Sequence, residues 1–100
     1  MQKENSKIEV ENVNVPGYVH RVDRARYEAM REALMKVLPD APPGMKVAEA
    51  QAALKQHLDQ TLFPGGEKSG WWLKAVHLDL EAKGIVERAP SKPVRIFRRK

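Results

Sequence analysis

The three histidines of this sequence are the first candidates for holding a metal ion or transferring a proton. His20, His57 and His77 are separated by 37 and 20 residues, which matches no metal-binding motif, and the chain contains no cysteine. Asp79 and Glu81 are two residues apart, so on a helix they would point in different directions and make a poor acid–base pair. We therefore expect no catalytic residue, no metal ion, no cofactor and no enzymatic activity. We interpret His77 as a partly buried, hydrogen-bonded side chain.

Residues 65–70, Gly-Gly-Glu-Lys-Ser-Gly, invite comparison with a phosphate-binding loop. In that motif a Lys and a Ser or Thr follow the last glycine, but here Trp71 and Trp72 stand in those positions. We expect a turn, followed by a helix that Ser69 caps. The alternative is weak anion binding by Lys68 and the N-terminus of that helix.

The net positive charge of the chain comes from its last third. The net charge is +5, and residues 67–100 contain nine Lys or Arg against four Asp or Glu, which accounts for the whole excess. A local excess of this kind is typical of a surface that binds a polyanion, most often nucleic acid, although it can also serve solubility alone. Contacts to phosphates alone would bind double-stranded DNA weakly and with little regard to sequence. The side chains that we expect to make such contacts are Arg88, Lys92, Arg95, Arg98 and Arg99.

Apolar spacings of three and four residues predict three helices. The first runs from an N-cap at Asp23 to about Leu38, the second covers about residues 47–58, and the third covers about residues 70–83. Gly84 then suits the left-handed position that ends a helix. Residues 85–88 and 94–98 are rich in β-branched side chains and flank a proline-bracketed turn, so we expect a β-hairpin there.

The segment before the first helix predicts an extended arm. Alternating apolar residues from Ile8 to Val15 change phase at Asn12, which predicts a bent or bulged strand, and Pro16-Gly17 predicts a turn. We therefore divide the chain into a disordered lead-in at residues 1–7, an extended arm at 8–22 and one folded domain at 23–100. Three helices followed by a hairpin predict an α+β domain of the winged helix-turn-helix class, in which the hairpin is the wing.

Two sets of residues carry a resemblance to known families. Residues 80–88, Leu-Glu-Ala-Lys-Gly-Ile-Val-Glu-Arg, resemble the junction of recognition helix and wing in many bacterial winged-helix transcription regulators. Residues 10–17, 62–66, 70–72 and 78–84 together resemble a small bacterial family of uncharacterised proteins that is similar to winged-helix domains. This resemblance implies the fold, and it implies no activity, ligand or site.

The third predicted helix is apolar on two sides. On a helical wheel Leu73, Val76 and Leu80 form the stripe that we expect to face the core. A helix that reads DNA bases would carry polar side chains on its other side, whereas this helix is apolar there and suits protein contact better. The second apolar face consists of Trp71, Ala75, Leu78 and Ala82.

Three occupants could cover this second face. One is a second copy of the chain, another is a different protein, and the third is the N-terminal arm of the same chain. Trp71 and Trp72 could alternatively stack on the bases of single-stranded nucleic acid, but we expect one of them in the core and the other over the second face. The arm would use its apolar side chains, which are Val13, Val15, Tyr18 and Val19.

The composition indicates a soluble globular protein of the cytoplasm. Hydrophobic residues make up 42% and charged residues 31%, no apolar run is long enough to cross a membrane, and the polar start contains no secretory signal. The lack of cysteine fits a reducing compartment. We expect a non-enzymatic winged-helix binding module that contacts nucleic-acid phosphates through its wing and tail. The alternative is a protein-interaction or homodimerisation domain that uses the second apolar face.

Overall fold

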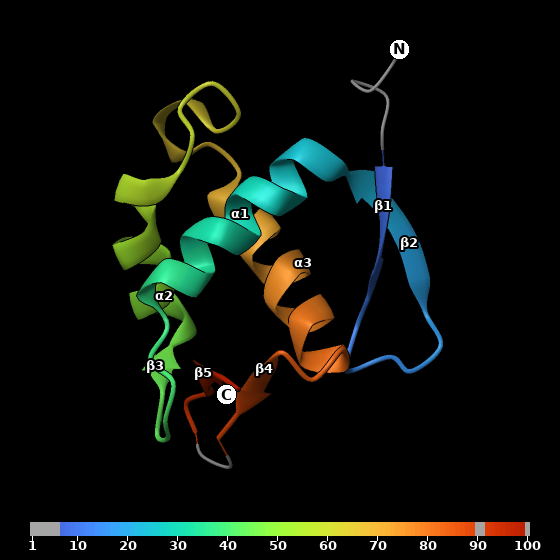
Figure 1. Cartoon of the computed structure of the whole chain (residues 1–100), viewed down its shortest axis with the longest axis vertical. Coiled ribbons are helices and arrows are strands. Elements are labelled where there is room, and N and C mark those ends of the chain that lie inside the picture. Colours follow the sequence, from blue (N-terminus) through green and yellow to red (C-terminus); the bar gives the residue numbers. More distant parts are fainter. Residues whose placement is uncertain (1–6, 90–91, 100) are drawn as a thin grey trace.

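The computed structural model describes residues 7–89 and 92–99. Within these residues the chain forms a mixed α+β fold with three α-helices and two small antiparallel sheets (Figure 1). The predicted disordered lead-in lies outside the described residues, apart from Lys7, which begins the first strand. In chain order the elements are β1 (Lys7–Glu11), β2 (Val19–Asp23), α1 (Arg24–Val37), β3 (Met45–Lys46), α2 (Val47–Leu54), the short 3-10 helices η2 (Lys55–His57) and η3 (Pro64–Gly66), α3 (Ser69–Ala82), β4 (Val86–Arg88) and β5 (Arg95–Arg98).

The first predicted helix is confirmed as α1, together with its cap. The Asp23 carboxylate accepts a hydrogen bond of 3.0 Å from the backbone N–H of Arg26, which satisfies one of the free donors of the first turn. Pro39 follows the end of the helix and prevents another turn. The side of α1 that carries the apolar spacing is buried, with Tyr27, Met30, Ala33 and Leu34.

The second helix is shorter than predicted, and a strand precedes it that the sequence did not reveal. α2 ends at Leu54, and the next three residues tighten into η2. Leu58 fits the predicted apolar spacing and is buried, but its backbone already belongs to the turn after η2. The missed strand β3 has two residues, and it exists because it pairs with β5 near the other end of the chain.

α3 lies where it was predicted, but its cap differs from the prediction. Ser69 is the first residue of the helix rather than its cap, and Lys68 holds the cap position with a left-handed φ of 61°. Ser69 is instead buried, and its hydroxyl oxygen lies 3.5 Å from the side-chain nitrogen of Gln51 in α2. At the other end Gly84 has a φ of +77°, so the predicted left-handed end of the helix is confirmed.

β4 and β5 form the predicted C-terminal hairpin, and β3 adds to the other edge of β5. The sheet therefore has the order β3-β5-β4, and both pairs are antiparallel. Ile96 in β5 is fully buried and lies opposite Met45 on one side and Arg88 on the other. Ile85 precedes β4 but extends the pairing, because its carbonyl accepts a hydrogen bond of 2.9 Å from the backbone N–H of Arg99.

The predicted N-terminal arm is a β-hairpin rather than one bent strand. β1 and β2 pair antiparallel, and the change of apolar phase at Asn12 marks the end of β1 rather than a bulge. The predicted turn at Pro16-Gly17 is confirmed: the backbone N–H of Tyr18 donates to the Val15 carbonyl at 3.0 Å, and Gly17 has a φ of +89°.

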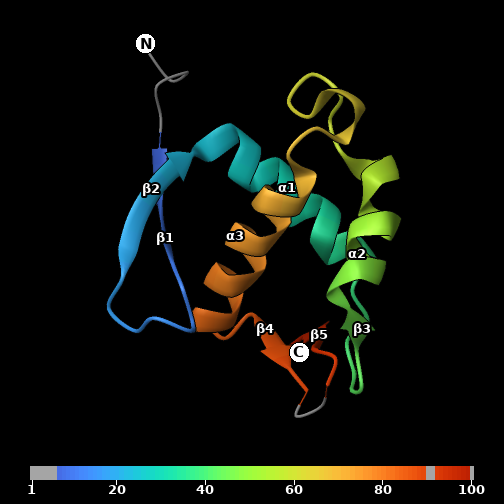
Figure 2. The same cartoon turned by 180° about the vertical axis from the view of Figure 1, so that it is seen from behind.

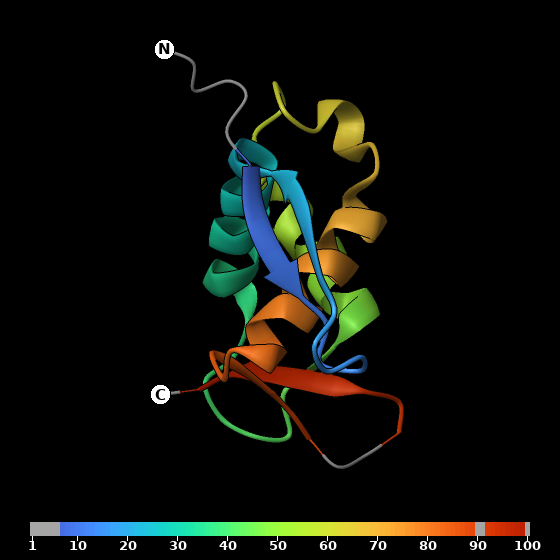
Figure 3. The same ribbon diagram turned by 90° about the vertical axis from the view of Figure 1, so that its right-hand side faces the viewer.

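The N-terminal hairpin lies along one side of α1 and α3 (Figure 3), whereas the C-terminal sheet and the loop before α3 lie at opposite ends of the molecule (Figures 1 and 2). Val10 and Val22 of the hairpin belong to the same apolar cluster as the helices. The predicted core stripe of α3 is confirmed, because Leu73, Val76 and Leu80 are at most 1% exposed. Among the described residues, no helix is long and apolar enough to cross a membrane.

Gly44 allows the α1–β3 connection to approach β5, and we expect Gly44→Ala to destabilise the fold. Its φ is +85°, and a Cβ there would lie 2.5 Å from the Ile96 carbonyl oxygen, a backbone atom that cannot turn away. The expected loss in the free energy of unfolding is roughly 2–5 kcal/mol, measured by urea denaturation.

Gly17→Ala provides the matched control for this substitution. Gly17 has a similar φ of +89°, but a Cβ there would meet nothing within 4 Å. Only backbone strain remains, so the expected loss is roughly 1–2 kcal/mol. Equal losses for the two variants would contradict the close approach of Gly44 to β5.

Candidate functional site

Two of the five predicted phosphate-binding residues are already paired with carboxylates. Arg88 donates two hydrogen bonds to Glu81, from Nε at 2.9 Å and from Nη2 at 3.3 Å. The Nε of Arg99 lies 3.2 Å from a carboxylate oxygen of Glu87, in a pair that is largely exposed and therefore adds little stability. The positive charge of Arg88 and Arg99 is thus locally neutralised.

The other three predicted residues keep their charge. Arg98 donates from Nε to the Leu38 carbonyl at 3.0 Å, and Arg95 donates from Nη1 to the Gly44 carbonyl at 3.5 Å. Carbonyl oxygens orient a guanidinium group without neutralising it. Lys92 is exposed. In the described parts of the chain, no carboxylate lies within ion-pair distance of these three side chains.

Lys46 adds a fourth cation that the sequence analysis missed. It lies directly opposite Arg95 across the β3–β5 pair, and its ammonium group forms no ion pair among the described residues, although the Glu49 carboxylate accepts a hydrogen bond of 3.1 Å from its backbone N–H. Like charges directly opposite on a sheet destabilise it. The sequence alone does not reveal that Lys46 lies beside Arg95, because the two residues are brought together only by the pairing of β3 with β5. We call Lys46, Lys92, Arg95 and Arg98 the cationic sheet, in which Lys92 lies in the loop before β5 and Arg98, three residues from Arg95, points to the opposite face of the strand.

The second apolar face of α3 is only partly exposed. Leu78 is 5% exposed, and it lines a shallow pocket together with Asn14, Val47 and Val94 of the same chain. Trp72 is buried as expected of one tryptophan, whereas Trp71 is 55% exposed and packs edge-on against Trp72. Ala75 and Ala82 are partly exposed. The arm side chains expected to lie over this face are themselves between 38% and 49% exposed, namely Val13, Val15, Tyr18 and Val19.

Asp79 of α3 is completely buried, although it carries an ionisable side chain. Its carboxylate accepts hydrogen bonds from the backbone N–H of Glu11 at 2.8 Å, from the Tyr27 hydroxyl, and from Lys83 Nζ at 2.6 Å. These donors belong to β1, to α1 and to the residue after α3. Burial, together with the hydrogen bond and the charge of Asp79, raises the pKa of the Tyr27 phenol well above its usual range.

His77 and Glu81 form a second buried polar contact on α3. His77 Nδ1 lies 2.7 Å from a carboxylate oxygen of Glu81, so the prediction of a buried, hydrogen-bonded histidine is confirmed. Burial raises the pKa of Glu81, but the hydrogen bonds from His77 and Arg88 outweigh it and leave this pKa below its usual 4.5. Since Arg88 is in β4, this contact joins α3 to the C-terminal sheet.

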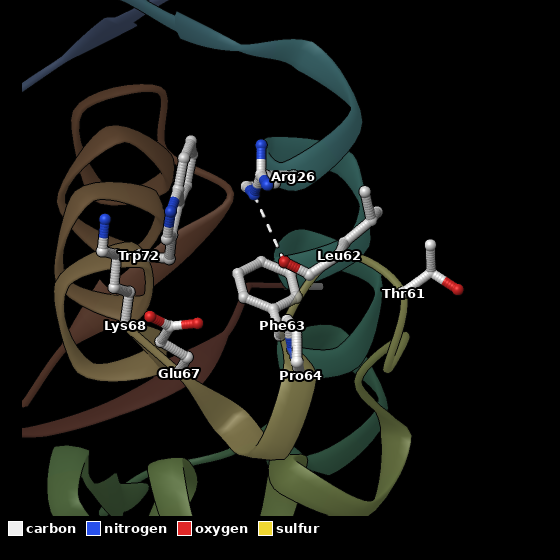
Figure 4. Close-up of a pocket in the computed structure, with 8 residues that line it drawn as sticks. All are labelled: Arg26, Thr61, Leu62, Phe63, Pro64, Glu67, Lys68 and Trp72. Atoms are coloured by element: carbon white, nitrogen blue, oxygen red, sulfur yellow. Dashed lines mark hydrogen bonds between the residues drawn. The ribbon is translucent and has the colours of Figure 1, made fainter.

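The buried carboxylates serve as structural acceptors, and their oxygens are engaged by the donors described above. Within the part of the chain that the structure describes, no three His, Asp or Glu side chains lie close enough to hold a metal ion. The glycine-containing loop before α3 instead borders a pocket of about 390 Å³ at the other end of the molecule (Figure 4). Lys68 lines it, together with two residues that the sequence analysis did not single out, Arg26 and Phe63.

Comparison with known proteins gives one match. Residues 7–96 match a family described as "Family of unknown function (DUF6958)". The chain belongs to this family. The comparison with curated proteins and the comparison with solved structures gave no match. The expected resemblance to a family without an assigned function is therefore confirmed. Membership in DUF6958 supplies no ligand or activity.

Replacing Asp79 tests whether its carboxylate joins three parts of the fold. We expect Asp79→Ala to lower the free energy of unfolding by roughly 3–5 kcal/mol, because the buried Tyr27 hydroxyl and the part-buried Glu11 N–H would both lose their acceptor. Tyr27→Phe removes one donor only, and its expected cost is roughly 1–2 kcal/mol. Urea denaturation measures both values, and an Asp79→Ala protein as stable as Tyr27→Phe would contradict this role.

The lowered pKa of Glu81 predicts a loss of stability in acid. Ionised Glu81 stabilises the folded state above about pH 4.5, the pKa in the unfolded chain, and this contribution disappears as the pH falls through the lower folded-state pKa. We therefore expect the wild type to lose stability below pH 4.5 more steeply than Glu81→Gln. Glu87→Gln is the control, because its pair with Arg99 is exposed, and it should follow the wild-type pH profile.

Proposed function

We propose that this chain is a winged-helix binding module whose C-terminal sheet contacts nucleic-acid phosphates. The order of α1, β3, α2, α3, β4 and β5, with the strands arranged β3-β5-β4, supports this assignment, because winged-helix domains have this order of elements. In such a domain β4 and β5 are the wing and α3 is the recognition helix. The short N-terminal hairpin is an addition to this arrangement.

The observation that carries the proposal is the uncompensated charge of the cationic sheet. Lys46 faces Arg95 directly, and neither side chain forms an ion pair among the described residues, although the Glu49 carboxylate accepts a hydrogen bond from the Lys46 backbone N–H. Two opposed cations cost stability in the free protein, and a phosphate between them would remove that cost. The Gly44 carbonyl holds the Arg95 side chain in advance, so less conformational freedom is lost on binding.

The surface of α3 supports phosphate contact rather than base reading. The C-terminal half of α3 is held against the N-terminal hairpin through the contact of Asp79 with Glu11. Its exposed positions in the N-terminal half are Gly70, Trp71 and Lys74, and of these three Lys74 alone carries a cationic donor that could reach a base edge. We therefore propose weak, sequence-independent binding to double-stranded DNA, dominated by charge.

The exposure of Trp71 favours a second candidate function, contact with another protein. Trp71 is 55% exposed, and its ring packs edge-on against Trp72 at a centroid distance of 5.1 Å. Large, rigid aromatic side chains are frequent anchors of protein interfaces. The partner would be a second copy or another protein, and Ala75 and Ala82 would lie near its edge, whereas Leu78 is already buried.

Binding to a duplex at different salt concentrations tests the phosphate proposal. We expect measurable affinity that falls steeply between about 50 and 200 mM salt. The double variant Lys46→Gln/Arg95→Gln should weaken binding and reduce the slope of log affinity against log salt by about 1.8, since two phosphate contacts are lost. Fluorescence anisotropy of a labelled duplex gives both quantities.

Arg21→Gln/Arg31→Gln is the matched control, because it removes the same charge from exposed positions of β2 and α1. It should leave the salt slope nearly unchanged. Equal effects of the two double variants, or no duplex binding in low salt, would refute the proposal. A wild-type dimer in sedimentation equilibrium that Trp71→Ala converts to a monomer would instead support the interface candidate.

A further inference from the structure

We propose that the pocket between α1 and the loop before α3 binds a free α-amino acid with an apolar side chain. This amino-acid pocket is lined by Arg26 from α1, by Phe63, Glu67 and Lys68 from the loop, and by Trp72 from α3. Its volume of about 390 Å³ is in the range of small-ligand sites. The proposal is independent of nucleic-acid binding, since the loop before α3 and the C-terminal sheet lie at opposite ends of the molecule (Figure 1).

Two aromatic rings form the apolar wall of the pocket. Phe63 is 1% exposed and Trp72 is 8% exposed, so both rings are held by the core and only small parts of them face the opening. The rings meet edge to face, with centroids 6.3 Å apart and planes at 81°. The exposed parts of these rings favour contact with an apolar ligand side chain.

Three donors at this wall have unused hydrogen-bonding capacity. The Arg26 Nε donates to the Leu62 carbonyl at 3.3 Å, and its Nη1 lies 3.6 Å from Asp23, which leaves Nη2 for a ligand (Figure 4). Lys68 has no carboxylate partner among the described residues, and the indole N–H of Trp72 has no acceptor there. The ammonium group of Lys68, the guanidinium of Arg26, whose charge Asp23 partly balances, and the indole N–H together suit a carboxylate.

Glu67 restricts the ligand further. Its carboxylate is exposed on the same rim and has no cationic partner among the described residues. It would repel a phosphate or a dicarboxylate, but it can accept a hydrogen bond from an ammonium group. A ligand that satisfies the donors, Glu67 and the aromatic wall together carries one carboxylate, one ammonium group and an apolar side chain. An α-amino acid has this chemistry.

Three related probes separate the contributions of these groups. L-Phenylalanine carries both charges, 3-phenylpropionate lacks the ammonium group, and 2-phenylethylamine lacks the carboxylate. The protein carries Trp71→Phe, so that Trp72 is its one tryptophan. Because the charged groups are exposed to water, we expect a weak Kd of about 1 mM for phenylalanine, seen as a saturable change in Trp72 emission or in calorimetry. Each analogue should bind at least tenfold more weakly.

Two substitutions in the same background test the pocket residues. Arg26→Gln should weaken phenylalanine binding about tenfold. Glu67→Gln should weaken phenylalanine and strengthen 3-phenylpropionate, because removal of the repelling carboxylate favours an anion without an ammonium group. Arg31→Gln, at an exposed position further along α1, is the control and should change neither affinity. Unchanged urea midpoints would show that the variants are folded.

Several outcomes would overturn the proposal. One is the absence of saturation by phenylalanine at tens of millimolar concentration in both fluorescence and calorimetry. Another is equal binding of all three probes, which would indicate a nonspecific aromatic contact. A third is a Glu67→Gln protein that binds phenylalanine and 3-phenylpropionate as its parent does, because Glu67 is exposed and its replacement should not disturb folding.

Discussion

The buried carboxylate of Asp79 is the interaction on which the arrangement of the other elements depends. A charge without solvent contact is tolerated only when donors surround it, and here they come from β1, from α1 and from the end of α3. The backbone N–H of Glu11 is a donor only while β1 stays in register beside α3. Asp79 therefore ties the N-terminal hairpin, a two-stranded unit that would be marginal alone, to the helical core.

A second carboxylate on the same helix connects it to the C-terminal sheet. Glu81 accepts hydrogen bonds from His77 within α3 and from Arg88 in β4. Asp79 and Glu81 are two residues apart and point in different directions, which makes them unsuited to acid–base chemistry but lets one helix hold a sheet on each of two sides. As a result, the open surface of α3 is confined mainly to its N-terminal half, beside Trp71 and the amino-acid pocket.

Local signals in the sequence predict much of the fold. Asp23 as a cap, the Pro16-Gly17 turn, Gly84 at a helix end and the two β-branched runs each act on neighbouring residues, and each is found where predicted. The prediction that Ser69 caps α3 was wrong, because its hydroxyl group instead makes a buried contact with the side chain of Gln51. β3 and the buried state of Asp79 depend on partners far along the chain, so no spacing within a window reveals them.

The number of charged residues in a stretch of sequence is a poor guide to where the folded protein presents a charged surface. The whole net charge falls in the last third of the sequence, yet Arg88 and Arg99 are neutralised there by Glu81 and Glu87. Strand pairing instead places Arg95 opposite Lys46, which belongs to a stretch whose charges balance in the sequence. Since Coulomb interactions fall off within a screening length of about 10 Å, the neighbours across a sheet decide the potential that a phosphate meets, and those neighbours are set by strand pairing rather than by position in the chain.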